Sequence, residues 1–196
     1  MQKRSCLCLF RPKVKLYICV QKWYTMYNSG LSGPRKKRIR EDAMSITRKS
    51  FGTTKAGEKA TLYTMTNANG MKVSVTDFGA NIVEIIVPDR NGKMDDVNLG
   101  YDSVSGYENN GPGYGSFLGR VANRIAGACY EVGGVRYTAE KNDGENCLHS
   151  GAKSYNKYMY ETELIEEEES DSVEFSRLSP DMEQGFPGNL DLTVTY

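Results

Sequence analysis

The sequence contains one histidine, one tryptophan and five cysteines among its 196 residues. No two cysteines have the CxxC spacing, and a single histidine cannot complete a usual zinc-ligand set with them. The sequence therefore predicts no metal site. Free thiols in a reducing cytosol are the simplest interpretation of the cysteines.

Long hydrophobic runs are also absent. No apolar segment approaches the roughly 20 residues that span a bilayer. The N-terminal piece SCLCLF is shorter than a signal-peptide core of about 7–15 residues. We therefore predict no membrane partner and a cytoplasmic location.

The net charge of zero conceals two oppositely charged segments. Residues 1–43 contain eleven Lys/Arg against two Asp/Glu, whereas residues 44–196 contain fourteen against twenty-three. Such a sharp step indicates segments with different origins or different tasks. We predict that residues 1–43 are a basic tail, disordered or a non-native extension, and that the globular part is 44–196.

Three alternatives remain open for the tail. Its segment RKKRIR could contact nucleic acid or act as a targeting signal, whereas chain ends are ordinarily disordered. The third alternative is that translation starts at Met44. N-terminal sequencing of the natural product would separate them, and we expect no nucleic-acid partner.

From about residue 60 the pattern is typical of β-strands. Alternating stretches flank Asn69-Gly70 and again Gly133-Gly134, and both patterns indicate hairpins. Residues 166–169, all glutamate, are expected in a solvated turn. Further strands are predicted by the segments NIVEIIVPD, DDVNLGY, KYMYETELIEEEES and NLDLTVTY.

Convincing amphipathic helices of ten or more residues are missing. Residues 102–116 are rich in Gly, Asn and Ser and predict a loop; their G-x-G-x-G spacing is not followed by the helix that a phosphate loop requires. Many short strands with Gly/Asn/Pro turns indicate an all-β sandwich or barrel. Because the sequence stops inside a predicted strand, we expect a domain truncated at its C-terminus.

Three segments contain the candidate chemistry. In GRVANRIAGACYEVGGVRYTA, Asn123 lies between Arg120 and Arg124, and an Asn-Arg pair supplies donors and an acceptor suited to sugar hydroxyls. In KNDGENCLHSG, His149 is expected where a strand meets a turn, and its imidazole can donate and accept near neutral pH.

The third segment is SPDMEQGFPGNLDLTVTY. Its Gly and Pro residues predict a tight turn that leads into a strand. The carboxylates of Asp181 and Glu183 could be functional, but capping of this turn is the simpler interpretation.

In this order, these segments resemble the aldose 1-epimerases, also called galactose mutarotases. The matching phrases are DFGANIVEIIVPDRNGK, DDVNLGYDSVSGY, GRVANRIAGACYEVGGVRYTA, NCLHSG and SPDMEQGFPGNLDLTVTY. The resemblance runs from about Phe51 to Tyr196 and covers about the N-terminal half of a typical member.

The resemblance implies an antiparallel β-sandwich of the galactose mutarotase-like supersandwich type that binds a free aldose. It implies interconversion of the α and β anomers of galactose or glucose by general acid–base ring opening, with no cofactor or metal. By matching motifs, Asn123 and Arg124 correspond to the sugar-binding pair. His149 corresponds to the first of two active-site histidines, a residue that binds the sugar and assists catalysis.

The same resemblance implies that the second histidine and the catalytic glutamate lie beyond this half. We therefore expect this chain to be an incomplete fragment without activity. Two local departures affect glycines of the family: Ser150 stands in a His-Gly-Gly motif, and Met182 stands where Gly is common. Either replacement requires a negative φ or tolerated strain.

Two other hypotheses remain. The chain could be a non-catalytic carbohydrate-binding module of the same fold, which the coding sequence beyond Tyr196 would distinguish from an enzyme. It could instead bind nucleic acid through RKKRIR, which would be salt-dependent. A half-sandwich also exposes apolar faces, so association or aggregation is expected.

Overall fold

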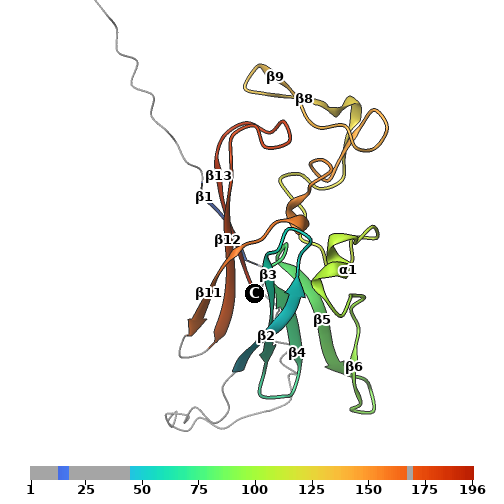
Figure 1. Cartoon of the computed structure of the whole chain (residues 1–196), viewed down its shortest axis with the longest axis vertical. Coiled ribbons are helices and arrows are strands. Elements are labelled where there is room, and N and C mark those ends of the chain that lie inside the picture. The colour runs from blue at the N-terminus through green and yellow to red at the C-terminus, as the bar shows by residue number, and fades with distance from the viewer. Residues whose placement is uncertain (1–12, 18–44, 167–169) are drawn as a thin grey trace, which may run out of the picture. The chain divides into compact units, whose positions relative to one another are not determined.

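A computed structural model describes residues 13–17, 45–166 and 170–196 (Figure 1). The elements in these ranges are thirteen strands, one five-residue α-helix and short 3-10 turns, so the predicted all-β class is confirmed. The chain divides into two units. Of the described residues, unit 1 contains 13–16, Leu118–Tyr155 and Ser176–Thr193; unit 2 contains Tyr17, 45–117, 156–166, 170–175 and Val194–Tyr196.

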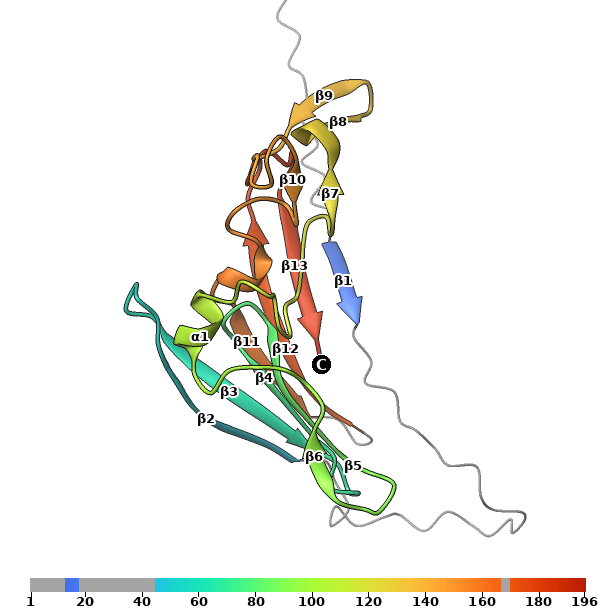
Figure 2. The same cartoon turned by 90° about the vertical axis from the view of Figure 1, so that its right-hand side faces the viewer.

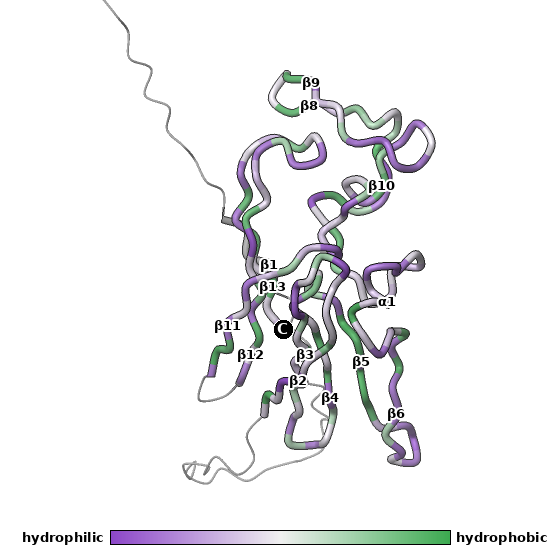
Figure 3. The backbone as a smooth tube through the Cα atoms, viewed as in Figure 1, coloured by the Kyte–Doolittle hydropathy of each residue, from purple (hydrophilic) through white to green (hydrophobic). Residues whose placement is uncertain are grey.

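Unit 2 contains a five-stranded antiparallel sheet. Its strands lie in the order β2 (Ser45–Thr53), β3 (Lys59–Thr66), β4 (Lys72–Thr76), β5 (Asn81–Pro88) and β6 (Met94–Asp96). The apolar run of β5 and the hydrophilic turn after it are visible in Figure 3. The sequence predicted all of these strands except β2, because its residues are mostly exposed and lack a sustained alternation.

Both faces of this sheet are covered, and β3 shows why. Successive side chains on a strand point to opposite faces. Leu62 therefore joins a core cluster with Phe51 and Tyr107 on one face. On the other face the Tyr63 ring lies 5.8 Å from that of Phe175, a residue of the second strand layer. This packing of two strand layers is the sandwich arrangement that the sequence predicted.

The second layer is built on three strands of the C-terminal half. The order of this sheet is β1 (Lys13–Tyr17), β13 (Leu190–Thr195), β12 (Asp171–Ser179) and β11 (Glu161–Glu166). Figure 2 shows β13 between β12 and β1. The sequence did not predict β1. The segment RKKRIR and residues 167–169 lie outside the described residues.

The segment 102–116 is not entirely a loop. Residues Val104–Glu108 form the short helix α1, which places Val104 and Tyr107 in the core of unit 2. The helix is one turn long, too short for hydrophobic periodicity to reveal it. Gly115 later in the segment has φ +61°, and its carbonyl oxygen accepts a hydrogen bond from the Ile82 N–H at 2.9 Å. A glycine here thus lets the loop backbone lie directly against β5.

The two predicted hairpins are present. Gly133 and Gly134, with φ of +61° and +79°, join β8 (Cys129–Val132) to β9 (Val135–Thr138). Between β3 and β4 only Gly70 has a positive φ, +80°. There the side chain of Asn67 accepts hydrogen bonds from the N–H groups of Asn69 and Met71, both at 3.0 Å. The Gly70 N–H donates to the Asn67 carbonyl oxygen at 3.0 Å, which closes a four-residue turn, 67–70.

Unit 1 has shorter strands and a smaller core. Besides β8 and β9 it contains the two-residue strands β7 (Arg124–Ile125) and β10 (Cys147–Leu148), which pair antiparallel. A 3-10 turn, Ala126–Ala128, joins β7 to β8. The core cluster is Ala128, Ala139, Cys147 and Phe186. In the parts of the chain described, no helix is long and apolar enough to cross a membrane.

Candidate functional site

The pairing of β7 with β10 brings the three predicted site residues together in unit 1. In its register Leu148 lies opposite Arg124. The His149 N–H then donates to the carbonyl oxygen of Asn123 at 3.0 Å. The predicted position of His149, directly after a strand and within a turn, is confirmed. Asn123, Arg124 and His149 therefore form one cluster.

The orientation of the His149 ring is set by the main chain. The Asn123 N–H donates to Nδ1 of the imidazole at 3.0 Å. A ring nitrogen that accepts a hydrogen bond carries no proton, so in the neutral ring the proton is on Nε2. The half-buried side chain is thus arranged as a hydrogen-bond donor through Nε2–H.

The turn that contains His149 is conformationally strained. Gly151 N–H donates to the Leu148 carbonyl oxygen at 3.1 Å, and φ is +52° at His149 and +68° at Ser150. Positive φ at both central residues is the pattern of a type I′ turn, which favours Asn and Gly. The sequence left open whether Ser150 has a negative φ or tolerates strain, and the structure shows the second.

Arg124 forms an ion pair that the sequence did not predict. Its Nε lies 2.6 Å from Oδ2 of Asp143, and the two side chains are 55% and 36% exposed. A longer bond, at 3.5 Å, joins its Nη1 to Oδ1 of Asn123. Because the ion pair uses the Nε edge, the Nη2 group keeps donors for a ligand.

Asn142 fixes the residue before the histidine. Its Oδ1 accepts from the Leu148 N–H at 2.6 Å, and its Nδ2 donates to the Leu148 carbonyl at 2.8 Å. Asn142 and Asp143 are supporting residues that sequence reasoning missed. The signal available was their place in the polar turn directly before His149, but polar turn residues are too common for that to single them out.

The carboxylates of the 180–189 turn are structural. Asp181 accepts from the Gly188 N–H at 2.5 Å. Glu183 accepts from Arg177 at 2.6 Å and from the Ser179 hydroxyl at 2.5 Å. Capping of the turn by Asp181 is thus confirmed, and Glu183 is held in an ion pair. Met182 has φ +59°, so this departure from glycine also tolerates strain.

Arg120 also belongs to this turn and not to the cluster. Its guanidinium donates to the Ser179 hydroxyl at 2.8 and 3.0 Å and to the carbonyl oxygens of Ser179, Pro180, Phe186 and Pro187. Every nitrogen of the guanidinium is thereby occupied. Of the two arginines on either side of Asn123, Arg124 alone retains donors for a ligand.

No catalytic carboxylate faces the histidine within the described chain. Asn123 is the one hydrogen-bond partner there of the imidazole. Glu145, four residues before His149, pairs with Lys141 at 2.5 Å, and this lysine lowers the pKa of the Glu145 carboxyl. Burial raises the pKa of the Cys147 thiol. Without such a carboxylate, the cluster of Asn123, Arg124 and His149 offers hydrogen-bond donors and acceptors for a neutral polar ligand.

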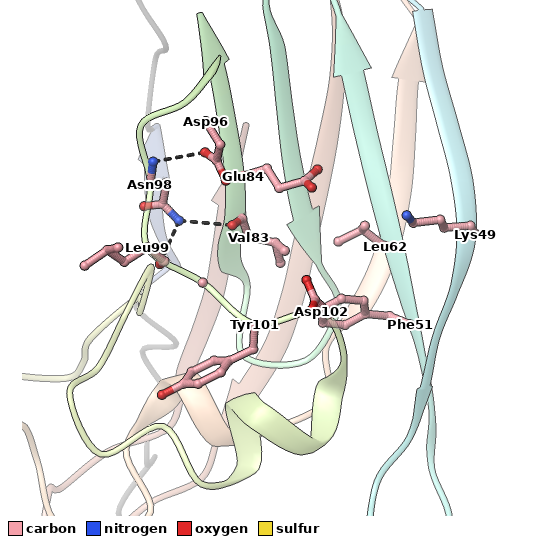
Figure 4. A pocket seen from close by; sticks show the side chains of 11 residues that line it. Lys49, Phe51, Leu62, Val83, Glu84, Asp96, Asn98, Leu99, Tyr101 and Asp102 are labelled. Atoms are coloured by element: carbon pink, nitrogen blue, oxygen red, sulfur yellow. Dashed lines mark hydrogen bonds between the residues drawn. The ribbon is translucent and has the colours of Figure 1, made fainter. Parts of the chain in front are cut away.

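Unit 2 has a separate groove with a volume of about 370 Å³ (Figure 4). Its lining includes the apolar side chains of Leu62 and Val83. The charged residues that line it are Lys49, Glu84, Asp96 and Asp102. Asp96 accepts from the N–H groups of Ile85 and Asn98, and Nδ2 of Asn98 donates to the Val83 carbonyl at 3.1 Å. These polar groups are largely occupied by the protein itself. None of the predicted site residues lines the groove.

No group of three or more His, Cys, Asp or Glu in the described ranges is arranged to hold a metal ion. The cluster in unit 1 consists of an amide, a guanidinium and a neutral imidazole. These groups suit an uncharged polyol better than a cation.

Antiparallel strands in two layers define a β-sandwich protein, and a cluster of amide, guanidinium and imidazole groups at a strand end is its candidate site. A family model described as aldose 1-epimerase matches residues 61–196, and the chain belongs to this family.

Comparison with known proteins gives the extent of the similarity. The chain is 37% identical over 153 residues to galactose mutarotase of Bos taurus, an alignment that covers 78% of this chain and 44% of that protein. It is 34% identical over 140 residues to aldose 1-epimerase of Escherichia coli (strain K12), covering 71% and 40%. The chain thus spans less than half the length of the curated relatives it matches.

Solved structures share the fold. Galactose 1-epimerase from Lactobacillus acidophilus NCFM superposes with a TM-score of 0.69 at 22% identity, covering 79% of this chain and 44% of that one. An aldose epimerase homologue from C. elegans gives a TM-score of 0.58 at 32% identity, covering 65% and 38%. The fold resemblance predicted from the five motifs is confirmed.

Proposed function

We propose that the chain contributes the sugar-binding part of an aldose 1-epimerase, an isomerase of hexose metabolism in the cytoplasm. Asn123, Arg124 and His149 hold a free aldose such as galactose or glucose. The observation that carries the proposal is the hydrogen bond from Asn123 N–H to Nδ1 of His149 at 3.0 Å. It leaves Nε2–H as a donor beside the exposed Asn123 amide and Arg124 guanidinium.

The reaction needs an acid and a base around the sugar. A base removes the proton from the anomeric hydroxyl while an acid protonates the ring oxygen, and the ring C–O bond breaks. The open aldehyde rotates about C1–C2 and closes on its other face. General acid–base catalysis of this kind contributes about 10²–10⁴-fold per well-placed group.

His149 polarises the sugar in this scheme and does not supply the whole chemistry. The resemblance implies a second histidine as the main acid and a glutamate as the base, whereas this chain contains one histidine. Glu145 and Glu183 are paired with Lys141 and Arg177. We therefore expect the 196-residue chain by itself to bind an aldose without interconverting its anomers.

The test combines binding with polarimetry. Because His149 is the single histidine, its imidazole gives one NMR signal set, which galactose should shift. His149→Ala and Arg124→Ala should weaken binding roughly tenfold, the effect of about 1.4 kcal/mol of lost hydrogen bonding to a charged or polar group. Mutarotation of α-D-galactose should proceed at the buffer rate.

Arg136→Ala is the matched control, because it removes the same charge elsewhere. This exposed arginine donates to Cys129 Sγ on the β8–β9 hairpin. The variant should leave galactose binding unchanged. An unchanged imidazole spectrum at saturating galactose would refute sugar binding, and a rate well above buffer would refute inactivity. Coding sequence beyond Tyr196 without a second His and a Glu would favour the non-catalytic binding module.

A further inference from the structure

Ser150 occupies a position that its backbone conformation disfavours. Its φ is +68°, in the left-handed region that glycine adopts without cost. Yet the residue is buried, with 3% of its surface exposed. A strained, buried residue beside a candidate site requires a compensating interaction.

That interaction comes from the hydroxyl. The Val121 N–H donates to Ser150 Oγ at 2.7 Å, and Ser150 Oγ donates to the Val121 carbonyl at 3.0 Å. Val121 precedes β7 and therefore has no partner within that strand pair. One hydroxyl thus satisfies both main-chain groups of the residue two positions before Asn123.

These bonds extend the β7–β10 pairing by side chains. The regular pairing ends at Leu148 and Arg124. Beyond it, Nδ1 of His149 accepts from Asn123 N–H, a role that a carbonyl oxygen has in a regular ladder. The Ser150 hydroxyl makes the next pair of bonds, with Val121. Along the chain, the two segments are therefore tied both before and after the bonds between Asn123 and His149.

We propose that Ser150 is a positioning residue, which ties the Val121–Arg124 segment to the His149 turn and so keeps the imidazole in the tautomer with its proton on Nε2. The assignment of a sugar as the ligand rests on the proposed function, but the tautomer does not. Without the hydroxyl, Val121–Asn123 moves away from the ring, and Nδ1 loses its fixed donor. The imidazole then samples both tautomers.

The experiment reads the tautomer directly. Uniformly ¹⁵N-labelled chain, in a two-bond proton–nitrogen correlation spectrum at a pH well above the usual histidine pKa of about 6.5, yields one imidazole pattern because the chain has one histidine. The wild type should show the Nε2–H tautomer alone. Ser150→Ala and Ser150→Gly should both show a mixture, and galactose affinity should fall roughly three- to tenfold, as expected for one or two lost hydrogen bonds.

The two variants separate the hydroxyl from the backbone. Ser150→Gly relieves the left-handed strain, whereas Ser150→Ala retains it, so a shared tautomer mixture identifies the hydroxyl as the cause. Ser74→Ala is the control for lost stability: Ser74 is fully buried and its hydroxyl bonds Thr64 and Glu84 at 2.8 Å in unit 2. It should leave the imidazole pattern unchanged.

The outcomes are distinct for the two proposals. An Nδ1–H pattern in the wild type, or an unchanged Nε2–H pattern in both Ser150 variants, overturns the positioning role. A tautomer that is fixed in the wild type and mixed in the variants, with no galactose response in any of them, supports the positioning role and refutes the proposed function.

Discussion

Glu183 and Arg177 form a nearly buried ion pair: Oε1 lies 2.6 Å from Nη2, and the side chains are 11% and 10% exposed. The same carboxylate accepts from the Ser179 hydroxyl, which in turn accepts from Arg120. Arg177 also lies over the Tyr155 ring, 5.2 Å from its centroid. The turn of residues 180–189 is therefore anchored through charge in addition to the burial of Phe186 in the core cluster of unit 1.

Glu183→Gln should lower the free energy of unfolding by about 3 kcal/mol, because it leaves the Arg177 charge buried without its counterion. Urea denaturation followed by far-ultraviolet circular dichroism measures this loss of stability. Glu145→Gln removes the same charge from the exposed pair with Lys141 and should leave the urea midpoint unchanged. Equal midpoints for the two variants would contradict the structural role given to Glu183.

Met182 occupies the third position of the turn Pro180–Glu183, where φ is +59° and the Glu183 N–H donates to the Pro180 carbonyl at 3.1 Å. The side chain is 49% exposed. Met182→Gly should therefore raise the free energy of unfolding by about 0.5–1 kcal/mol, the left-handed strain less the added freedom of the unfolded chain.

Gly188 in the same turn provides the converse test. Its φ is +81°, and a Cβ there would meet no atom within 4 Å. Gly188→Ala should thus lower the free energy of unfolding by about 1 kcal/mol through conformation alone. Met182→Gly is expected to stabilise the chain. A loss of stability as large as that of Gly188→Ala would contradict the strain assigned to Met182.

Gly115 and Gly113 isolate steric contact from backbone strain. Both have positive φ, +61° and +75°. A Cβ on Gly115 would lie 1.8 Å from the Ile82 carbonyl oxygen, whereas one on Gly113 would come no closer than 3.8 Å to Ser116 Oγ. Gly115→Ala should cost about 2–3 kcal/mol more than Gly113→Ala, since the loop must leave β5. Thermal melts of the two variants that coincide would contradict this close approach.

Asp77 gives a pH dependence of stability. Burial raises the pKa of its carboxyl above the usual range, although hydrogen bonds from Thr61 and Thr76 lower it in part. The folded state therefore binds the proton more tightly than the unfolded state, and folding is favoured when Asp77 is protonated. This contribution is full below the unfolded pKa and is lost as pH rises through the folded value. Asp77→Asn should stabilise the chain at pH 7, and the gain should vanish on acidification.

Asp95→Asn is the control with the opposite sign. Lys93 lowers the pKa of the exposed Asp95 carboxyl through a hydrogen bond and its charge. The ionised form is favoured in the folded state, so that contribution is present above the unfolded pKa and lost as pH falls. Urea midpoints from pH 4 to pH 7 measure both variants. A stabilisation by Asp77→Asn that does not change with pH would show that the effect is not one of ionisation.

The sequence allowed the fold to be predicted where the pattern is regular. The apolar run NIVEIIVPD identified β5, alternation identified β13, and Gly133-Gly134 identified a hairpin, because these signals are local. It could not identify β2, whose residues are mostly exposed and lack a sustained alternation, or the single-turn α1. The motifs singled out Asn123, Arg124 and His149, which the structure brings together, and their role in binding a ligand stays a prediction. Asp143 and Asn142 could not, because their roles depend on the approach of the 140–146 turn to β7, which no local pattern encodes.

The six hydrogen bonds of Arg120 have a calorimetric consequence. Unit 1 holds few of the buried hydrophobic side chains of the described chain: Ala128, Ala139, Cys147, Tyr155, Phe186 and Leu192. Newly exposed apolar area raises the heat capacity, and newly exposed polar area lowers it. Exposure of the Arg120 and Glu183 contacts on unfolding therefore adds nothing to the heat capacity. Per residue, we expect the free energy of unfolding of unit 1 to curve less with temperature than that of the apolar sheet in unit 2.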